Sequence, residues 1–213
     1  RDYHFSVTTN QTLFAVAVNL NLRNALQAAQ GLVEGSKAAA DMPSMPRAFY
    51  AAAAAGFARG GAGPVTWRSI TERASDEGKQ VNLCRGRPGL GLQVASNLHF
   101  LDAGVLPGDA AGMLSPKSAV GALAINGSLG VIEASSAGNV TSCLMNAMLG
   151  STGYAMGVLP FTLEPGTKAY RFVKVDGMAP GKPDARIGRY PFVYSATMQY
   201  KKTGAGALTT DQK

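Results

Sequence analysis

The alternation of apolar and polar residues divides the first part of the chain into one strand and two helices. Residues 13–18 (LFAVAV) form a short apolar run, which is typical of a strand buried on both faces. Apolar residues then recur at helical spacing between positions 22 and 33, and Asn21 precedes them as a candidate N-cap. Residues 45–57 are rich in alanine, the strongest helix former, and predict a second helix.

The middle of the chain repeats the order of strand and then helix. Residues 81–84 (VNLC) predict a strand, and residues 92–101 predict a helix that follows a glycine-containing turn. Ser135 or Ser136 can cap a further helix, which runs to about residue 148.

The other apolar segments predict strands, and they cover residues 154–159, 170–175 and 190–200. Asn126-Gly127 is a signal for a type I′ hairpin turn, and Asp176-Gly177 marks a second turn. Strands that alternate with helices indicate the α/β class with a mostly parallel sheet.

Composition supports a folded chain of one large domain or two small lobes. Of the 213 residues, 46% are hydrophobic and 15% are charged, which excludes a disordered chain. Apolar runs end well before the ~18 residues that a membrane span needs. The first three residues do not resemble a signal peptide, so we expect position 1 to be an internal point of a longer product. The net charge is +7, but the basic residues are scattered, so nucleic acid is not an expected partner.

The cysteines and histidines do not form a metal-binding pattern. The chain has two of each, and they show no metal-ligand spacing, so we expect no zinc and no other cofactor. Cys84 and Cys143 are either two buried thiols or one disulfide. A disulfide that closes this loop would add about 4 kcal/mol by the loop-entropy estimate.

Four segments together resemble the phosphate-type periplasmic solute-binding proteins of ABC importers. They read LFAVAVNLNLRNALQ, VNLCRGRPGLGLQVASNLHF, GSTGYAMGVLPF, and YRFVKVDGMAP followed by ARIGRYPFVYSATMQYKK, and they occur in the family's order over residues 13–202. The resemblance implies two α/β lobes joined by hinge strands, with the ligand in the cleft between them. On this mapping residues 19–165 form a complete second lobe. Residues 1–18 and 166–213 form the hinge strands and a partial first lobe.

A subgroup of this family has a cysteine before the arginine-containing turn and another in the capped helix. The resemblance to that subgroup implies a Cys84–Cys143 disulfide and a periplasmic or extracellular location. It also implies a binding protein rather than an enzyme, with a small oxyanion as ligand and an importer permease as partner. Neither a Gly-x-Ser-x-Gly elbow nor a Walker motif occurs in the sequence, in line with this expectation.

The family's anion site falls on the turn that follows residues 81–84. Its arginine corresponds to Gly86, and its serine and threonine correspond to Leu90 and Leu92. Backbone N–H groups at the start of the helix remain, and Arg85 or Arg87 could supply charge. The candidate ligand-binding residues are therefore Arg85, Arg87, Gly89, Leu90, Gly91 and Leu92. The turn is either purely structural or a residual, altered anion site.

Two functions of different classes follow. The first is a solute-binding-type domain with an eroded anion site. The second is a secreted structural or filament-forming subunit that reuses the fold without a ligand. The family's opening strand and helix have no counterpart in the sequence, so they either precede position 1 in a longer product or come from another chain. In the second case we expect self-association through the sheet edge that a missing strand would leave.

Overall fold

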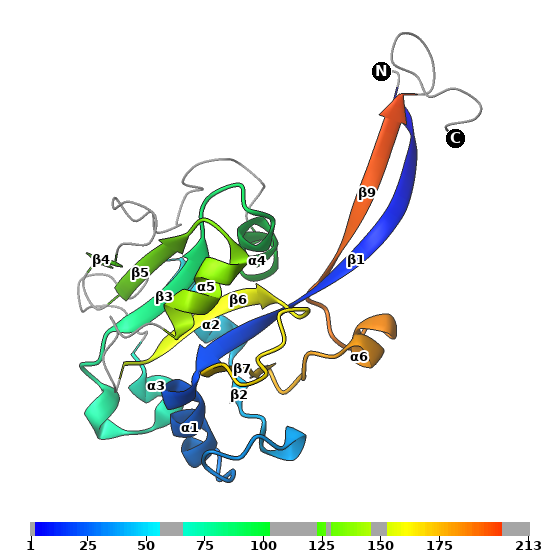
Figure 1. Ribbon diagram of the computed structural model, residues 1–213. Coiled ribbons are helices and arrows are strands. Elements are labelled where there is room, and N and C mark those ends of the chain that lie inside the picture. The colour runs from blue at the N-terminus through cyan, green and yellow to red at the C-terminus, as the bar shows by residue number, and fades with distance from the viewer. Residues whose placement is uncertain (1–2, 56–65, 103–122, 127–128, 146–152, 202–213) are drawn as a thin grey trace.

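A mixed β-sheet forms the centre of the fold, and a two-stranded ribbon extends from it (Figure 1). The structure is a computed structural model, and it describes residues 3–55, 66–102, 123–126, 129–145 and 153–201. Within those ranges the strand order is β4-β5-β3-β6-β1-β7, and β9 pairs with β1. The strands of this sheet are β1 (Tyr3–Asn19), β3 (Val81–Gly86), β4 (Leu123–Asn126), β5 (Leu129–Ala134), β6 (Ala155–Pro160), β7 (Tyr170–Phe172) and β9 (Val193–Lys201).

The sheet is parallel only in its middle. β3 runs parallel to β5 and β6, whereas β4 is antiparallel to β5, and β1 is antiparallel to β6, β7 and β9. The expectation of a mostly parallel sheet is therefore wrong. An apolar run in the sequence reports that a strand is buried, but it does not report the direction in which the chain enters the sheet.

Helices cover both faces of the sheet (Figure 1). α4 contacts α2, β3 and β6, and α5 contacts β3, β5 and β6. No helix in the described ranges is long and apolar enough to cross a membrane. The helices are α1 (Leu20–Ala29), α2 (Arg47–Ala54), α3 (Arg68–Thr71), α4 (Gly91–Leu101), α5 (Ala137–Leu144) and α6 (Lys182–Arg186).

Side-chain caps fix the first turns of α1 and α5. Asn19, not the predicted Asn21, caps α1 and accepts a hydrogen bond from the N–H of Leu22 at 3.1 Å. Ser136 caps α5 and accepts from the N–H of Asn139 at 3.1 Å, as one of the two predicted alternatives. Because α1 begins directly after β1, its cap is the last residue of the strand.

The second half of the described chain contains the predicted strands and one of the predicted turns. Residues 170–175 form two short strands, β7 and β8 (Lys174–Val175), and β8 pairs in parallel with β2 (Ser44–Met45). Asp176 and Gly177 have φ values of 47° and 79°, which confirms the turn after β8. β4 and β5 form the antiparallel pair expected around Asn126, but residue 127 of the predicted hairpin turn lies outside the described residues.

The disulfide between Cys84 and Cys143 is present and joins β3 to α5. The Cα atoms of the two cysteines are 5.9 Å apart, and both side chains are buried. Gly157 on the neighbouring strand β6 pairs with Cys84, and a Cβ atom at this glycine would collide with the carbonyl oxygen of Cys84. The disulfide therefore lies where β3 and β6 pack closely together.

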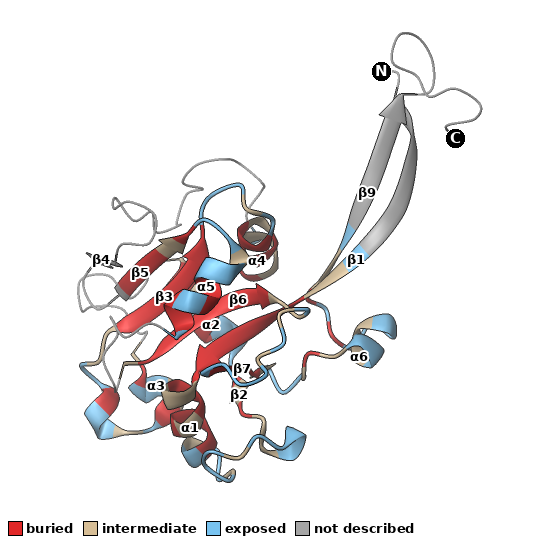
Figure 2. Ribbon diagram, in the orientation of Figure 1, coloured by how far each residue is buried: buried red, intermediate tan, exposed pale blue. Residues whose placement is uncertain are grey.

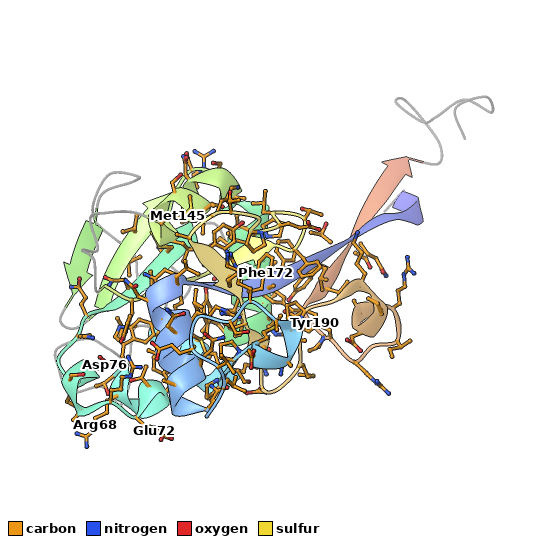
Figure 3. All side chains as sticks on the ribbon, turned by 60° about the horizontal axis from the view of Figure 1, so that its bottom comes forward. Arg68, Glu72, Asp76, Met145, Phe172 and Tyr190 are labelled. Carbon is orange, nitrogen blue, oxygen red and sulfur yellow. A yellow bond between two sulfur atoms is a disulfide. The ribbon has the colours of Figure 1, made fainter. Side chains whose placement is uncertain are left out.

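Buried residues lie along the strands of the sheet and on parts of the helices that cover it (Figure 2), and the apolar and aromatic ones form one core cluster. Trp67 is fully buried, packs on Phe49 at a ring distance of 5.4 Å, and donates its indole N–H to the carbonyl of Gln80. Tyr190 lies near the point where the ribbon leaves the sheet, and its hydroxyl donates to the carbonyl of Phe14 at 2.9 Å (Figure 3).

The ribbon consists of the first part of β1 and all of β9. β1 pairs with β6 and β7 only from Phe14 to Asn19, whereas from Tyr3 to Leu13 it pairs with β9. The register between the two strands shifts twice, between Tyr3 and Phe5 and between Thr8 and Asn10. Across the described residues, each ribbon strand therefore has one paired edge and one edge that faces no other strand over this length.

Candidate functional site

The turn between β3 and α4 is closed by backbone hydrogen bonds. The N–H of Arg87 donates to the carbonyl of Ala134 at 2.9 Å, and the N–H of Leu90 donates to the carbonyl of Arg87 at 3.1 Å. Gly89 has a φ of 81°, a left-handed conformation that glycine adopts without strain. These hydrogen bonds order the turn, and the N–H of Leu90 is thereby used within the protein and is not available to an anion.

Gly86 lies beside the two leucines of the turn. A Cβ atom placed on Gly86 would lie 2.8 Å from Cδ2 of Leu90 and 3.1 Å from Cδ1 of Leu92. Leu92 is buried, with 5% of its surface exposed. The leucine side chains therefore occupy the space that a larger residue at position 86 would enter.

The two arginines of the turn differ in their surroundings. Arg85 is buried, and its guanidinium forms an ion pair with the carboxylate of Glu133 at 3.1 Å. The two residues are also direct partners in the pairing of β3 with β5. Arg87 is exposed. The positive charge of Arg85 is therefore largely compensated, and Arg87 holds its charge in solvent, where it attracts an anion weakly.

The N-terminus of α4 retains two free donors. The N–H groups of Gly91 and Leu92 donate to no residue within the described ranges. Helix N-termini attract anions through such groups. However, Leu90, which stands at the N-cap position, makes no side-chain capping bond, so a hydroxyl donor at this end is lacking.

An apolar cavity lies between α4 and the base of the ribbon. Its volume is about 200 Å³, and Phe14, Val94, Leu98 and Tyr194 contribute to its lining. Gly91 also borders it, so the cavity begins at the same helix end as the turn. The surface beside the turn is therefore apolar, which favours neither a phosphate nor another hydrated anion.

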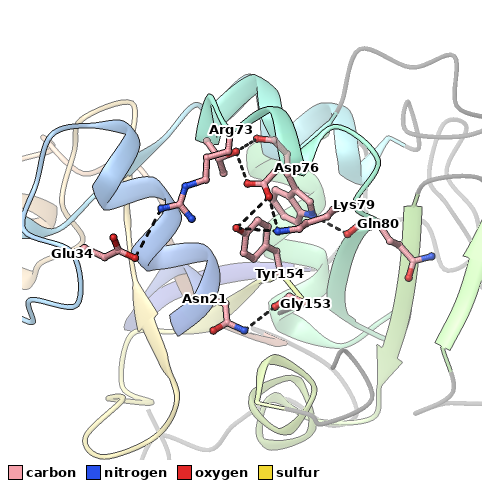
Figure 4. A network of polar contacts seen from close by, with 10 residues as sticks. Asn21, Glu34, Arg73, Asp76, Lys79, Gln80, Gly153 and Tyr154 are labelled. Carbon is pink, nitrogen blue, oxygen red and sulfur yellow. Dashed lines mark hydrogen bonds and ion pairs between the residues drawn. The ribbon is translucent and has the colours of Figure 1, made fainter. Parts of the chain in front are cut away.

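A buried acid–base cluster links the end of α3 to β6 (Figure 4). Asp76 is fully buried and accepts a hydrogen bond from Thr71 at 2.8 Å, and its carboxylate lies 2.5 Å from Nζ of Lys79. The Tyr154 hydroxyl lies 3.4 Å from Asp76, and Lys79 lies 4.4 Å from the centre of the Tyr154 ring. Burial by itself raises the pKa of Asp76, but the hydrogen bonds from Lys79 and Thr71 and the charge of Lys79 hold it below its ordinary value. Because every polar group of the cluster has a partner within it, we assign it a structural role.

No local pattern in the sequence predicts this cluster. Asp76, the last residue of a short 3-10 helix (Ala74–Asp76), and Lys79 are three positions apart, but Tyr154 is distant in sequence and directly precedes β6. No group of three potential metal ligands occurs among the described histidine, cysteine, aspartate and glutamate side chains.

No family model matches the chain, and no curated protein matches it in sequence. Its fold is nevertheless clear from solved structures. The chain has the α/β fold of the periplasmic binding proteins, and it spans about three fifths of the length of the structures that it matches, which fits one complete and one partial lobe.

The particular structures that it is similar to carry names of the phosphate class. A phosphate-bound structure from Clostridium perfringens, assigned to a phosphate ABC transporter substrate-binding protein, matches 93% of this chain and 59% of its own, with a TM-score of 0.55 and 12% identity. An ABC-type phosphate transport receptor from Vibrio cholerae matches 96% and 62%, with a TM-score of 0.58 and 10% identity. PstS from Borrelia burgdorferi matches 92% and 59%, with a TM-score of 0.53 and 10% identity. None of these names is that of an enzyme.

Proposed function

We propose that this chain is an extracytoplasmic domain of the solute-binding-protein type whose oxyanion site is eroded, so that it binds phosphate weakly or not at all. It acts as a binding or interaction module rather than as an enzyme. Residues 19–165 form its second lobe, and residues 1–18 and 166–213 form hinge strands and part of a first lobe. An importer permease is the partner that this class of protein implies.

The contact of Leu90 and Leu92 over Gly86 carries the proposal. Each donor missing from a buried polar site costs about 1–3 kcal/mol, and each 1.4 kcal/mol is about tenfold in affinity. Three missing side-chain donors therefore weaken oxyanion binding by several orders of magnitude. The remaining N–H groups of Gly91 and Leu92 and the exposed Arg87 offset this loss only in part.

The disulfide supports an extracytoplasmic location. Structural disulfides persist in oxidising compartments such as the periplasm, and they are rare in the reducing cytosol. The bond between Cys84 and Cys143 is buried beside the candidate turn, where it stabilises the fold and takes no part in ligand contact. Its position is the one expected from the cysteine-containing subgroup.

Calorimetric titration with phosphate at low salt tests the eroded site. We expect no dissociation constant tighter than the high micromolar range, and a nanomolar value would refute the proposal.

A second experiment introduces the family's polar residues into the turn. Gly86→Arg alone should destabilise the fold because the leucines fill its space, whereas Gly86→Arg with Leu90→Ser and Leu92→Thr should be better tolerated and should gain phosphate affinity. The double variant that lacks Gly86→Arg serves as the matched control.

The ribbon favours a second candidate, a secreted structural or filament-forming subunit. A two-stranded ribbon is marginally stable in water unless further strands or a packed face support it. The free edges of β1 and β9 carry N–H and C=O groups that can pair with a strand of another body, including a second copy. If the contact between copies runs head to tail, an open filament results.

Light scattering over a concentration series tests this second candidate on the chain as it stands. Self-association predicts a mass that rises with concentration towards dimers or larger species. A stable monomer with one cooperative melting transition would refute the second candidate and leave the eroded-site proposal standing.

A further inference from the structure

A cavity of about 330 Å³ lies where four segments meet, and it shares no lining residue with the turn after β3. The segments are the start of α2, the end of α4, the turn after β8 and the stretch before β9. The volume falls in the lower part of the range of about 300–1,000 Å³ that small-molecule pockets occupy. The residues that matter most for its chemistry are Arg47, His99, Asp176, Met178, Tyr190 and Phe192.

One wall of this cavity is aromatic, uncharged and held in place. The imidazole of His99 stacks on the ring of Phe192, with centroids 4.2 Å apart and planes 8° from parallel. Phe192 and Tyr190 are buried, and Tyr190 is fixed by its hydrogen bond to Phe14. Burial and the neighbouring charge of Arg47 lower the pKa of His99 to about 4, so its ring is neutral at physiological pH.

Two opposite charges border the same cavity. The carboxylate of Asp176 accepts a hydrogen bond from the N–H of Arg47 at 2.8 Å, and the guanidinium of Arg47 donates to the carbonyl of His99. Both charged groups are thus oriented by backbone contacts. Neither side chain forms an ion pair within the described part of the chain.

We propose that this cavity binds a small zwitterion of the class of apolar α-amino acids. The ligand's carboxylate pairs with the guanidinium of Arg47, and its ammonium group pairs with the second carboxylate oxygen of Asp176. Its apolar side chain lies on Met178, which is 37% exposed, and against the wall formed by His99 and Phe192. A ligand that carries both charges satisfies both side chains, whereas a singly charged ligand leaves one of them with water alone.

Titration calorimetry with L-leucine and L-phenylalanine as probes tests this site on the full chain. We expect saturable binding with a dissociation constant below about 1 mM. N-acetyl-leucine lacks the ammonium group and leucinamide lacks the carboxylate, and each should bind at least about tenfold more weakly because one charge-assisted hydrogen bond is lost.

Two variants that each remove one charge assign the contacts. Asp176→Asn keeps an acceptor for the N–H of Arg47 and should weaken the binding of leucine at least about tenfold, while the affinity for N-acetyl-leucine stays unchanged. Arg47→Gln should weaken the binding of leucine to a similar degree, while the affinity for leucinamide stays unchanged. Arg87→Gln removes the same charge at the turn after β3 and should leave leucine binding unaltered.

The absence of saturable binding at about 10 mM of either amino acid would overturn the proposal. Leucine binding that both Asp176→Asn and Arg47→Gln leave unchanged would also overturn it, as would loss of binding in Arg87→Gln alone. Because phosphate binding is measured separately and depends on different residues, failure here leaves the proposal of an eroded oxyanion site untouched.

Discussion

The guanidinium of Arg85 lies 3.1 Å from the carboxylate of Glu133, across two directly paired positions of neighbouring parallel strands. Only 3% of the Arg85 side chain and 14% of the Glu133 side chain is exposed. A charge that sequence reasoning offered to a ligand is therefore held by the protein itself. Because Glu133 compensates the charge of Arg85, this basic residue adds little positive electrostatic potential to the neighbouring candidate site.

Removal of one partner of this ion pair should be costly. Glu133→Gln leaves the buried charge of Arg85 without its carboxylate, so we expect the free energy of unfolding to fall by about 3 kcal/mol. The double variant Arg85→Met with Glu133→Leu removes both charges and should recover much of this loss. Urea unfolding of the single and double variants measures the difference. A single variant as stable as the wild type would show that the pair is not a buried one.

The disulfide should account for a large share of the stability. Reduction, or replacement of both cysteines by alanine, removes a cross-link that closes a loop of 59 positions, and the loop-entropy estimate is about 4 kcal/mol. Thermal melting with and without reductant measures this loss. Intact mass with alkylation is the control, since the native protein should take up no label before reduction and two labels after it. Two labels before reduction would contradict the bond.

Local signals in the sequence predicted the elements that depend on local chemistry. The apolar run at residues 81–84 lies in β3, the run at residues 154–159 overlaps β6 from residue 155, and the helix predicted over residues 92–101 is α4. Ser136 caps α5 because a hydroxyl before a helix satisfies its N–H groups regardless of the rest of the fold. The start of β1 at Tyr3 was not predicted. Its first residues become a strand only through pairing with β9, nearly the whole chain away.

In the candidate site, too, contacts between sequence neighbours could be predicted, whereas contacts that depend on strand pairing could not. The turn residues are neighbours in sequence, so the closeness of Gly86 to Leu90 and Leu92 follows from their spacing. The partner of Arg85 could not, because Glu133 reaches it only through the pairing of β5 with β3. The cavity that contains Arg47, His99 and Asp176 likewise joins segments that no spacing rule connects.

Asp76 should make the stability depend on pH in the acid range. Its folded-state pKa lies below its ordinary value, so its contribution is present above the unfolded pKa of about 4 and is lost as pH falls through the folded pKa. Asp76→Asn should lower the free energy of unfolding at pH 7 by about 2–3 kcal/mol, since hydrogen bonds to a charged group are lost. The variant should also lose part of the acid dependence.

Chemical unfolding between pH 7 and pH 2.5 measures this effect. Glu164→Gln is the matched control, because this substitution also removes one negative charge but does so at an exposed position. It should change stability by less than about 0.5 kcal/mol. An Asp76→Asn variant with the stability and acid dependence of the control would refute the structural role assigned to the cluster.

His99 should add a second pH dependence, between about pH 6.5 and pH 4. Burial and the charge of Arg47 lower its pKa from 6.5 to about 4, against a smaller opposite effect of Asp102. In this interval the unfolded chain binds more protons than the folded chain, so the free energy of unfolding decreases as pH falls. With allowance for partial exposure, we expect a loss of about 1–2 kcal/mol in the free energy of unfolding from pH 7 to pH 5.

His99→Gln loses the stacking on Phe192 at every pH, but it should remove this pH dependence of the free energy of unfolding. His4→Gln, which changes the other histidine of the chain, should retain the pH dependence. Urea unfolding at half-unit steps of pH resolves the two cases, and a slope that survives in His99→Gln would assign the titration to another group.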